Sequence, residues 1–164
     1  MARRPENPQQ FVEQFGLLLE ADGVPRVAAH LLGVLLISAE ARSLEDLAAQ
    51  LGVSKASVSV NARLLEEKGV IEREGRQADR RDYYRVADDM LERTLEQRIN
   101  RWRRFQETFA GACVACGNRD DVVRQRLDGM AHVYGHMLDA TVRVLSDWRT
   151  KGAKRAIPSP VRSR

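Results

Sequence analysis

The chain has 164 residues, of which 43% are hydrophobic and 30% are charged, and its formal net charge is +4. This length suits one compact domain, or one small domain with helical extensions. The most apolar stretch, Leu31 to Ala39, is far shorter than the roughly 18 residues of a membrane span. The basic residues Arg3 and Arg4 are followed by Pro5 rather than by the apolar region of a signal peptide, so the sequence predicts a soluble, cytoplasmic protein with no membrane partner.

Two helices are predicted ahead of residue 41. The first covers Gln9 to Glu20, and its apolar side carries Phe11, Phe15 and Leu18. Pro25 suits the start of the second helix, which we expect to run to about Glu40. Because the second helix is nearly all apolar, it is predicted to be the central core helix of the domain that follows, with a partner-binding or membrane role as the alternative.

The stretch from Ser43 to Arg85 has the pattern of a helix, a tight turn, a second helix and a charged β-hairpin. Ser43 is an N-cap residue followed by two acids in the first turn, and Gly52 ends this helix. Ser54 caps the second helix, which runs up to Gly69. The buried stripe of the second helix is Val58, Ala62 and Leu65. This is the plan of a winged helix-turn-helix.

The outer face of the second helix is small, hydroxylated and basic, which suits the major groove of DNA. It consists of Ser57, Ser59, Val60 and Arg63. Two segments rich in β-forming residues, 70–73 and 83–86, predict the two strands of a wing. The residues from Gly75 to Arg81 are expected to form a polar loop between these strands. The predicted fold is therefore mainly α, with a two-stranded wing.

Three motifs stand in order in this region: Gly-Val-Ser-Lys-Ala-Ser-Val-Ser from Gly52, Leu-Leu-Glu-Glu-Lys-Gly-Val-Ile-Glu-Arg from Leu64, and Asp79-Arg80-Arg81. Together they resemble the MarR family of bacterial transcription regulators. The runs Phe11 to Gly16 and Arg26 to Ile37, with the wing sequence Asp-Arg-Arg-Asp-Tyr-Tyr-Arg, are similar to the GbsR-like, lipid- or drug-responsive branch. The resemblance covers roughly residues 8–150.

Two long amphipathic helices are predicted after the wing. The first begins at Asp88, and apolar residues then recur in steps of three and four from Leu91 to Cys113 and again from Val123 to Trp148, with Gly117-Asn118 between the two helices. A hairpin of this kind leaves apolar surface for a second chain, which predicts a homodimer. The resemblance implies the same assembly.

The chain from Arg149 onward is basic and contains no acid, which predicts a disordered tail that is either merely solvated or adds attraction to phosphates. The predicted organisation is an arm and first dimerisation helix (1–24), a winged helix-turn-helix domain (25–87), a helical dimerisation hairpin (88–149) and a basic tail (150–164).

Family members bind roughly palindromic double-stranded DNA as two-fold dimers, so the resemblance implies that each recognition helix reads one half-site. The residues expected to contact phosphates and base edges are Ser54, Lys55, Ser57, Ser59, Asn61, Arg63, Arg76, Arg80 and Arg81. Of these, Asn61 lies nearer the core face. Asp79 resembles the family's aspartate that orients the following arginines toward a minor groove. The alternative is that acids of the wing neutralise its arginines, namely Glu72, Glu74 and Asp82.

The chain lacks the sequence patterns of an enzyme, such as a glycine-rich phosphate loop or a nucleophile elbow, so no catalytic residue and no cofactor is predicted. The resemblance implies a repressor that a small ligand releases. The pocket for this ligand is expected among Phe11, Phe15, Leu31, Leu35, Trp102 and Phe105. Their apolar character favours a lipophilic effector, and plain core packing is the alternative. Two other functions stay open: a winged-helix module that binds protein, and a thiol- or metal-responsive sensor.

Four residues have the spacing of a zinc pattern, Cys-x2-Cys-x15-His-x3-His: Cys113, Cys116, His132 and His136. We expect no single metal site, because the cysteines end one helix while His132 lies roughly 18 Å along the returning helix. The histidines are predicted to face away from the apolar stripe, on a solvated or dimer-lining face, with a metal on that face as the alternative. The cysteines are expected to pack as small hydrophobic residues, with a redox switch as the alternative.

Overall fold

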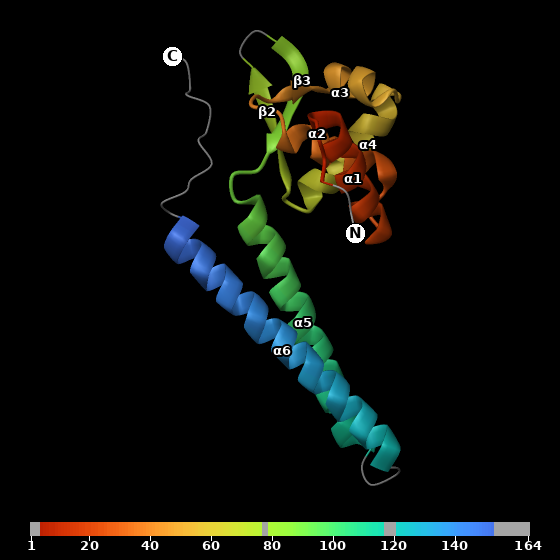
Figure 1. Ribbon diagram of the computed structural model, residues 1–164, viewed down its shortest axis with the longest axis vertical. Coiled ribbons are helices and arrows are strands. Elements are labelled where there is room, and N and C mark those ends of the chain that lie inside the picture. The colour runs from red at the N-terminus through yellow and green to blue at the C-terminus, as the bar shows by residue number, and fades with distance from the viewer. Residues whose placement is uncertain (1–3, 77–78, 117–120, 153–164) are drawn as a thin grey trace. The chain divides into compact units, whose positions relative to one another are not determined.

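The computed structural model describes residues 4–76, 79–116 and 121–152. These residues form two compact units, one ending at Met90 and the other beginning at Leu91. We call them the winged unit and the helical hairpin (Figure 1). Among the described residues, no helix combines the length and the apolar content that crossing a membrane requires.

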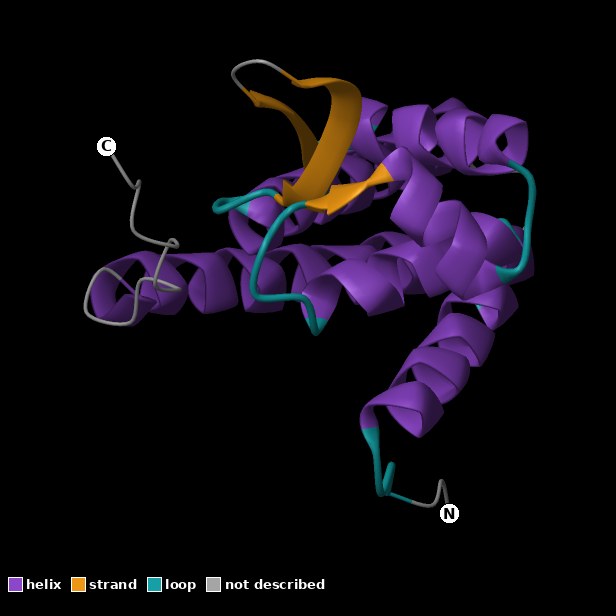
Figure 2. Cartoon of the chain, turned by 90° about the horizontal axis from the view of Figure 1, so that it is seen from above, coloured by secondary structure: helices purple, strands orange, loops and turns teal. Residues whose placement is uncertain are grey.

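The winged unit contains four helices and three strands among its described residues. In chain order they are α1 (Pro8–Ala21), α2 (Arg26–Leu36), β1 (Arg42–Ser43), α3 (Leu44–Leu51), α4 (Lys55–Glu67), β2 (Ile71–Arg76) and β3 (Asp79–Val86). The strands form one antiparallel sheet in the order β1-β3-β2, drawn in orange in Figure 2. The mainly helical fold with a β wing is therefore confirmed.

The helix boundaries follow from capping residues. The Ser43 side chain accepts a hydrogen bond from the Asp46 amide at the start of α3, and the Ser54 side chain accepts one from the Ser57 amide at the start of α4. Between these helices Gly52 takes a left-handed conformation with φ 65°, which a residue with a Cβ adopts at a cost. The predicted helix-turn-helix is confirmed at each of these positions.

The core of the winged unit is built around α2. Every residue of α2 from Ala28 to Leu35 is buried, and Leu31 and Val34 are among the most completely buried side chains. The predicted stripe of α4, Val58, Ala62 and Leu65, lies in the same cluster. Full burial of one such aliphatic side chain contributes about 1.5–3 kcal/mol. The burial of α2 confirms its predicted role as the central core helix.

The end predicted for α2 was wrong. The helix stops at Leu36 and not near Glu40, and the chain then leaves it to reach β1. The Ser38 hydroxyl donates to the carbonyl oxygen of Val34 at 2.8 Å, and the Ser38 amide donates to the Leu35 carbonyl. Serine side chains compete with helical backbone hydrogen bonds in this way. The apolar pattern alone did not reveal that the helix ends here.

The polar loop predicted from Gly75 to Arg81 was also wrong. Strand β2 extends through Arg76 and β3 begins at Asp79, so both strands continue into the predicted loop. Arg76 pairs with Asp79, and the register shifts between Glu74 and Arg76. Cross-strand hydrogen bonds therefore override the weak β propensity of these polar residues. The third strand, β1, was not predicted, because two residues carry no periodic signal.

The helical hairpin consists of α5 (Met90–Cys116) and α6 (Asp121–Gly152). The Tyr134 ring of α6 stacks on two rings of α5, with centroids 4.7 Å from Phe105 and 5.6 Å from Phe109. The two predicted apolar stripes therefore meet. Near the other end of α6, Arg149 pairs with Glu92 at 3.3 Å and with Glu96 at 2.6 Å.

Two boundaries of the hairpin differ from the prediction. Helix α5 begins at Met90 and not at Asp88, and α6 continues to Gly152, so residues 150–152 belong to a helix and not to a tail. The predicted break at Gly117-Asn118 and the predicted tail from residue 153 lie outside the described residues.

Candidate nucleic-acid interface

The outer face of α4 is formed by side chains opposite its buried stripe. Val60 is 65% exposed, Arg63 is exposed, and Ser57 and Ser59 are half-buried. Arg63 Nη2 donates to the Ser59 hydroxyl at 3.3 Å, which holds the guanidinium along the helix. A small, hydroxylated face with one long cation can approach base edges closely.

The first turn of α4 supplies further polar groups. The Ser54 oxygen accepts from the Ser57 amide at 3.2 Å, so its hydroxyl proton remains available to donate to a phosphate. Lys55 Nζ lies 2.9 Å from Glu45 Oε1, and both side chains are partly or largely exposed. The hydrogen bond from Lys55 lowers the pKa of Glu45. Exposed pairs of this kind are weak, so Lys55 can exchange its carboxylate for another anion.

Asn61 differs from the other predicted contacts on α4. It is half-buried, and its Nδ2 donates to the carbonyl oxygen of Ser57 at 2.8 Å. The amide is therefore bonded to the backbone of its own helix and does not extend outward, in line with its expected position near the core face.

The wing carries a charged cluster around Asp79, which we call the wing clamp and which consists of Asp79, Arg81 and Tyr83. Arg81 Nε lies 3.1 and 3.0 Å from the two Asp79 oxygens, and Arg81 Nη2 lies 2.6 Å from Oδ2. The Arg81 amide donates to Asp79 Oδ1 at 3.0 Å, and the Tyr83 hydroxyl donates to Oδ2 at 2.9 Å. Such charge-assisted, bidentate contacts give strong geometric specificity.

The wing clamp shifts the pKa values of all three groups. Hydrogen bonds from Arg81 hold the pKa of Asp79 well below its usual range. The same contact raises the pKa of Arg81, and the hydrogen bond to the carboxylate raises the pKa of Tyr83. The carboxylate and the guanidinium therefore both stay charged at neutral pH, with Arg81 held in one orientation.

Of the two other predicted wing arginines, Arg76 precedes the clamp in the sequence and Arg80 lies between its members Asp79 and Arg81. The Arg76 guanidinium lies 4.1 Å from the centroid of the Tyr83 ring, a cation–π contact. Arg76 Nη2 also donates to the Ala41 carbonyl oxygen at 3.3 Å. Arg80 is exposed, and within the described part of the chain its side chain has no hydrogen bond or ion pair. Three cations thus gather on the distal part of the wing.

The alternative prediction, that acids of the wing neutralise its arginines, holds for Arg73 and Arg85. Arg73 pairs with Asp82 at 3.4 Å, and Arg85 contacts three acids, with distances of 2.8 Å to Glu72, 3.6 Å to Glu74 and 2.6 Å to Asp88. These acids hold the basal part of the wing. In the described part of the wing their ion pairs are with Arg73 and Arg85, whereas the arginines predicted to bind DNA are Arg76, Arg80 and Arg81.

The residues predicted for an effector pocket fall into both units. Within the winged unit, Leu31 and Leu35 are core residues, and Phe11 and Phe15 stack with centroids 5.5 Å apart. Within the hairpin, the Trp102 and Phe105 rings lie 6.4 Å apart, and both contact the Tyr134 ring. The pocket itself stays a prediction.

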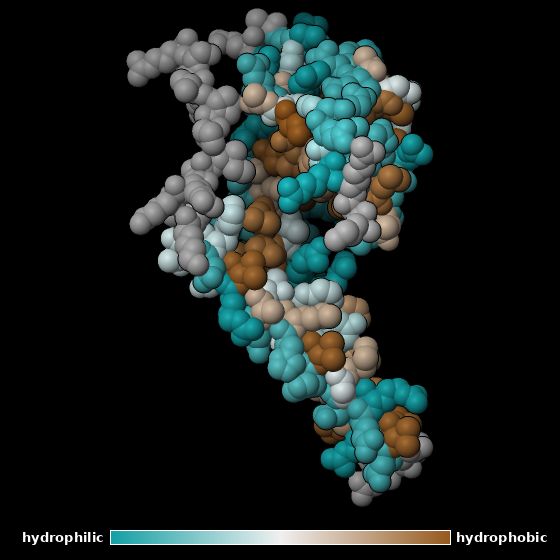
Figure 3. Space-filling view, in the orientation of Figure 1, coloured by the Kyte–Doolittle hydropathy of each residue, from teal (hydrophilic) through white to brown (hydrophobic). Residues whose placement is uncertain are grey.

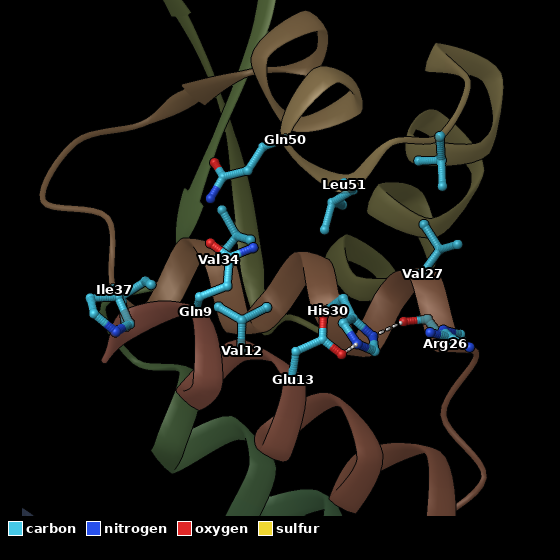
Figure 4. Close-up of a pocket in the computed structure, with 12 residues that line it drawn as sticks. Gln9, Val12, Glu13, Arg26, Val27, His30, Val34, Ile37, Gln50 and Leu51 are labelled. Carbon is cyan, nitrogen blue, oxygen red and sulfur yellow. Dashed lines mark hydrogen bonds and ion pairs between the residues drawn. The ribbon is translucent and has the colours of Figure 1, made fainter. Parts of the chain in front are cut away.

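A separate pocket of about 240 Å³ lies within the winged unit, and none of the six predicted effector-pocket residues lines it. His30 lies at its wall, with Nδ1 2.9 Å from the Arg26 carbonyl oxygen and Nε2 3.3 Å from Glu13 Oε2 (Figure 4). Sequence reasoning missed His30, although a single histidine in the apolar run of α2 was a visible signal.

The cysteines and histidines of the zinc-like spacing occupy different surroundings in the hairpin. Cys113 Sγ lies 4.0 Å from the carbonyl oxygen of Arg124. His132 and His136 are exposed, and their Nε2 atoms lie 2.9 Å apart. Among the described residues, no three His, Cys, Asp or Glu side chains gather as they would around a metal ion.

The fold and this surface define a winged helix-turn-helix protein, with a recognition helix and an arginine-bearing wing on one unit. The sequence profile of the MarR family matches residues 22–82, from the loop before α2 into β3. The chain is 33% identical over 129 residues to the HTH-type transcriptional regulator MmpR5 of Mycobacterium tuberculosis, and the match covers 78% of each chain. The chain therefore belongs to the MarR family.

A solved structure described as a transcriptional regulator is also similar to this chain. It matches with a TM-score of 0.70 at 30% identity, covering 87% of this chain and 98% of that one. The protein is accordingly a DNA-binding transcription regulator and not an enzyme.

Proposed function

We propose that this regulator is a homodimeric repressor that acts in the cytoplasm, binds a roughly palindromic operator and leaves it when a small lipophilic ligand binds. The observation that carries the proposal is the wing clamp, in which Asp79 holds Arg81 by its side chain and its amide. Ordering a long cation before it meets its target lowers the entropy cost of binding. In a wing that only faced solvent, holding Arg81 in one orientation would serve no binding function.

In the proposed complex α4 lies in the major groove. Arg63 reads base edges there, while hydroxyls and the first turn of α4 contact phosphates. The phosphate contacts come from Ser54, Lys55, Ser57 and Ser59. Arg80 and Arg81 enter the adjacent minor groove, whose negative potential attracts guanidinium groups. Arg76, stacked on Tyr83, supports this part of the wing. Asn61 acts by stabilising α4, because its side-chain amide donates to the Ser57 carbonyl oxygen.

The proposal of a homodimer rests on apolar side chains that the hairpin leaves exposed. Val133 is 48% exposed and Val144 is 55% exposed, and Figure 3 shows brown, hydrophobic residues at several places along the hairpin. The other exposed apolar residues of the hairpin are Leu91, Phe105, Val114, Val122, Val123, Met130, Met137 and Val142. Exposed apolar residues concentrated on the two helices of the hairpin indicate an interaction surface, and a second copy satisfies two-fold symmetry.

DNA binding is tested by selecting fragments from a random duplex pool with the full chain. We expect an inverted repeat whose half-sites are about one helical turn apart. Arg63→Ala should reduce enrichment of this sequence, whereas Arg98→Ala, which removes the same charge from an exposed position of α5, should not. Recovery of no common sequence, or equal loss in both variants, would contradict the proposed recognition helix. A reporter gene placed behind the selected site then distinguishes repression from activation.

Dimerisation is tested by sedimentation of a Val133→Glu/Val144→Glu variant. Because both valines are exposed in the single chain, the variant should stay folded and become monomeric, while Gln125→Glu at another exposed position of α6 should leave the dimer intact. A wild-type chain that sediments as a monomer would refute the dimer. So would an unchanged dimer in the double valine variant.

The effector proposal extends the likeness to the GbsR-like, lipid- or drug-responsive branch. Its support is the apolar and aromatic character of the six predicted pocket residues. A medium-chain fatty acid and a neutral lipophile of equal length serve as probes. We expect one of them to quench the fluorescence of Trp102 in a Trp148→Phe background and to release DNA at the same concentration. Absence of quenching would assign these residues to core packing, and quenching without release of DNA would show adventitious binding.

A further inference from the structure

We propose that His132 and His136 form a surface site on α6 for a divalent transition-metal ion, with Cu²⁺ bound most tightly and Ni²⁺ next. This site is separate from the DNA-binding surface and does not depend on the proposed repressor function. It uses two of the four residues of the zinc-like spacing and leaves the cysteines out.

The two imidazoles lie next to each other on one face of α6. Residues four apart on an α-helix are neighbours on the same face, and here the Nε2 atoms of His132 and His136 lie 2.9 Å apart. Their rings meet edge to face, with centroids 4.3 Å apart and an interplanar angle of 86°. Both side chains are exposed, so an ion from solvent can reach the two nitrogen atoms directly.

The separation of the nitrogen atoms favours one class of coordination geometry. Two nitrogen ligands about 2.05 Å from one ion are about 2.9 Å apart when the angle between them is 90°, and about 3.3 Å apart at the tetrahedral angle. The observed 2.9 Å matches the right-angled arrangement. Tetragonal nitrogen and oxygen coordination is typical of Cu²⁺ and Ni²⁺, and Cu²⁺ also stands highest in the affinity order of the divalent first-row metals.

Two acids flank the histidine pair on α6. Asp128 lies one turn before His132 and Asp139 lies one turn after His136, and both are exposed. Within the described residues no third His, Cys, Asp or Glu side chain completes a cluster. The remaining coordination positions are therefore assigned to water, which makes this an open, two-nitrogen site and not a structural zinc site.

A plain hydrogen bond between two neutral imidazoles is the competing explanation of the short distance. It would use the same nitrogen atoms, with one ring donating and the other accepting. For two exposed rings in water such a bond contributes little to stability. The two explanations differ in what they predict for metal binding, because a pair that is only hydrogen-bonded should bind Cu²⁺ no more tightly than a single histidine.

The experiment titrates the full, untagged chain with Cu²⁺ in a non-coordinating buffer containing glycine as a competitor. Affinity is measured by calorimetry, and coordination is measured by electron paramagnetic resonance. We expect one Cu²⁺ per chain, hyperfine coupling to two imidazole nitrogens, and weaker binding of Ni²⁺ and Zn²⁺ in separate titrations. Because the second ring binds intramolecularly, His136→Ala should weaken Cu²⁺ binding at least about tenfold.

Two matched variants keep the number of histidines constant. Gln125→His/His136→Ala places the second ring two turns from His132, roughly 10 Å along the axis, and should bind Cu²⁺ as weakly as His136→Ala. Asp128→His/His136→Ala rebuilds a pair four residues apart at an exposed position and should restore the affinity. His30 is retained in all variants and should add little background binding, since its side chain is only 9% exposed and both ring nitrogens have partners.

The outcomes separate the two explanations. Restored affinity in the rebuilt pair, together with loss in the displaced one, supports the site. Equal Cu²⁺ binding by the wild-type chain and the displaced variant would overturn it, as would coupling to a single nitrogen or tighter binding of Zn²⁺ than of Cu²⁺. Far-ultraviolet circular dichroism of each variant verifies that α6 remains helical, so that loss of binding is not mistaken for loss of structure.

Discussion

Replacing Asp79 by asparagine should weaken DNA binding although it removes no cation from the protein. Asparagine keeps the size of the side chain and one acceptor oxygen, so the bond from the Arg81 amide can survive. It removes the charge and the second acceptor oxygen, to which Arg81 Nη2 at 2.6 Å and the Tyr83 hydroxyl at 2.9 Å donate. Arg81 then samples many rotamers in the free protein.

The magnitude follows from the cost of ordering that one side chain. Immobilising a long, rotamer-rich side chain on binding weakens affinity by about two- to tenfold. If a dimer engages both wings, the two factors multiply to about four- to a hundredfold. The clamp prevents this loss in the wild-type protein, because Arg81 is already held in place before DNA is bound.

The matched control is Asp82→Asn, which removes the same charge from the wing. Asp82 contacts Arg73 at 3.4 Å, so its loss leaves the clamp intact and slightly strengthens the attraction to phosphates. Affinity is measured by fluorescence anisotropy over a range of salt concentrations. Both asparagine variants should keep the wild-type salt slope, whereas Arg81→Ala should lower the slope by about one if Arg81 lies near a phosphate.

The reasoning is refuted if Asp79→Asn binds the selected operator as tightly as Asp82→Asn does. It is also refuted if Asp79→Asn flattens the salt slope as Arg81→Ala does, because the aspartate would then act through the number of phosphate contacts and not through orientation.

Three further outcomes are expected. Arg63→Ala should relax base preference at one position of the half-site, costing about 1–3 kcal/mol there; competition with single-base operator variants measures this, and uniform weakening at every position would contradict a base contact. Gly16→Ala should lower the free energy of unfolding by about 1–3 kcal/mol, because a Cβ there would lie 2.5 Å from the His30 ring. In the same urea titration Gly129→Ala, in open space, should raise it by up to about 1 kcal/mol. Because the folded wing lowers the pKa of Asp79, the ionised carboxylate stabilises the fold above the ordinary pKa of 3.8. This stability is lost progressively as the pH falls from 3.8 through the still lower folded value, and a carboxyl NMR midpoint at or above 3.8 would contradict the clamp.

The local signals of the sequence located most of the helical fold. Ser43, Gly52 and Ser54 act within one turn of their own positions, so their roles as caps and as a left-handed turn could be assigned without any knowledge of distant contacts. The buried stripe of α4 and the two long amphipathic helices follow from periodicity, which depends only on the geometry of a single helix.

The sheet and the partners of each charge could not be assigned in this way. The pairing of Arg42 with Tyr84 joins residues far apart in the sequence, and the polar distal part of the wing is extended because of its cross-strand bonds and not because of its composition. Five arginines of the wing look alike in the sequence. Only the fold decides that Arg85 is held by acids at its base while Arg81 is held by Asp79.

By itself, therefore, the sequence determined the helix boundaries that caps define, the membership of the core, and the family to which the motifs belong. The tertiary structure alone decided the end of α2, the length of the wing, the buried place of His30 and the convergence of His132 with His136. The physical reason is range. Capping and helical periodicity act over a few residues, whereas strand register, ion-pair choice and side-chain rotamers are settled by neighbours that the chain brings together only when it folds.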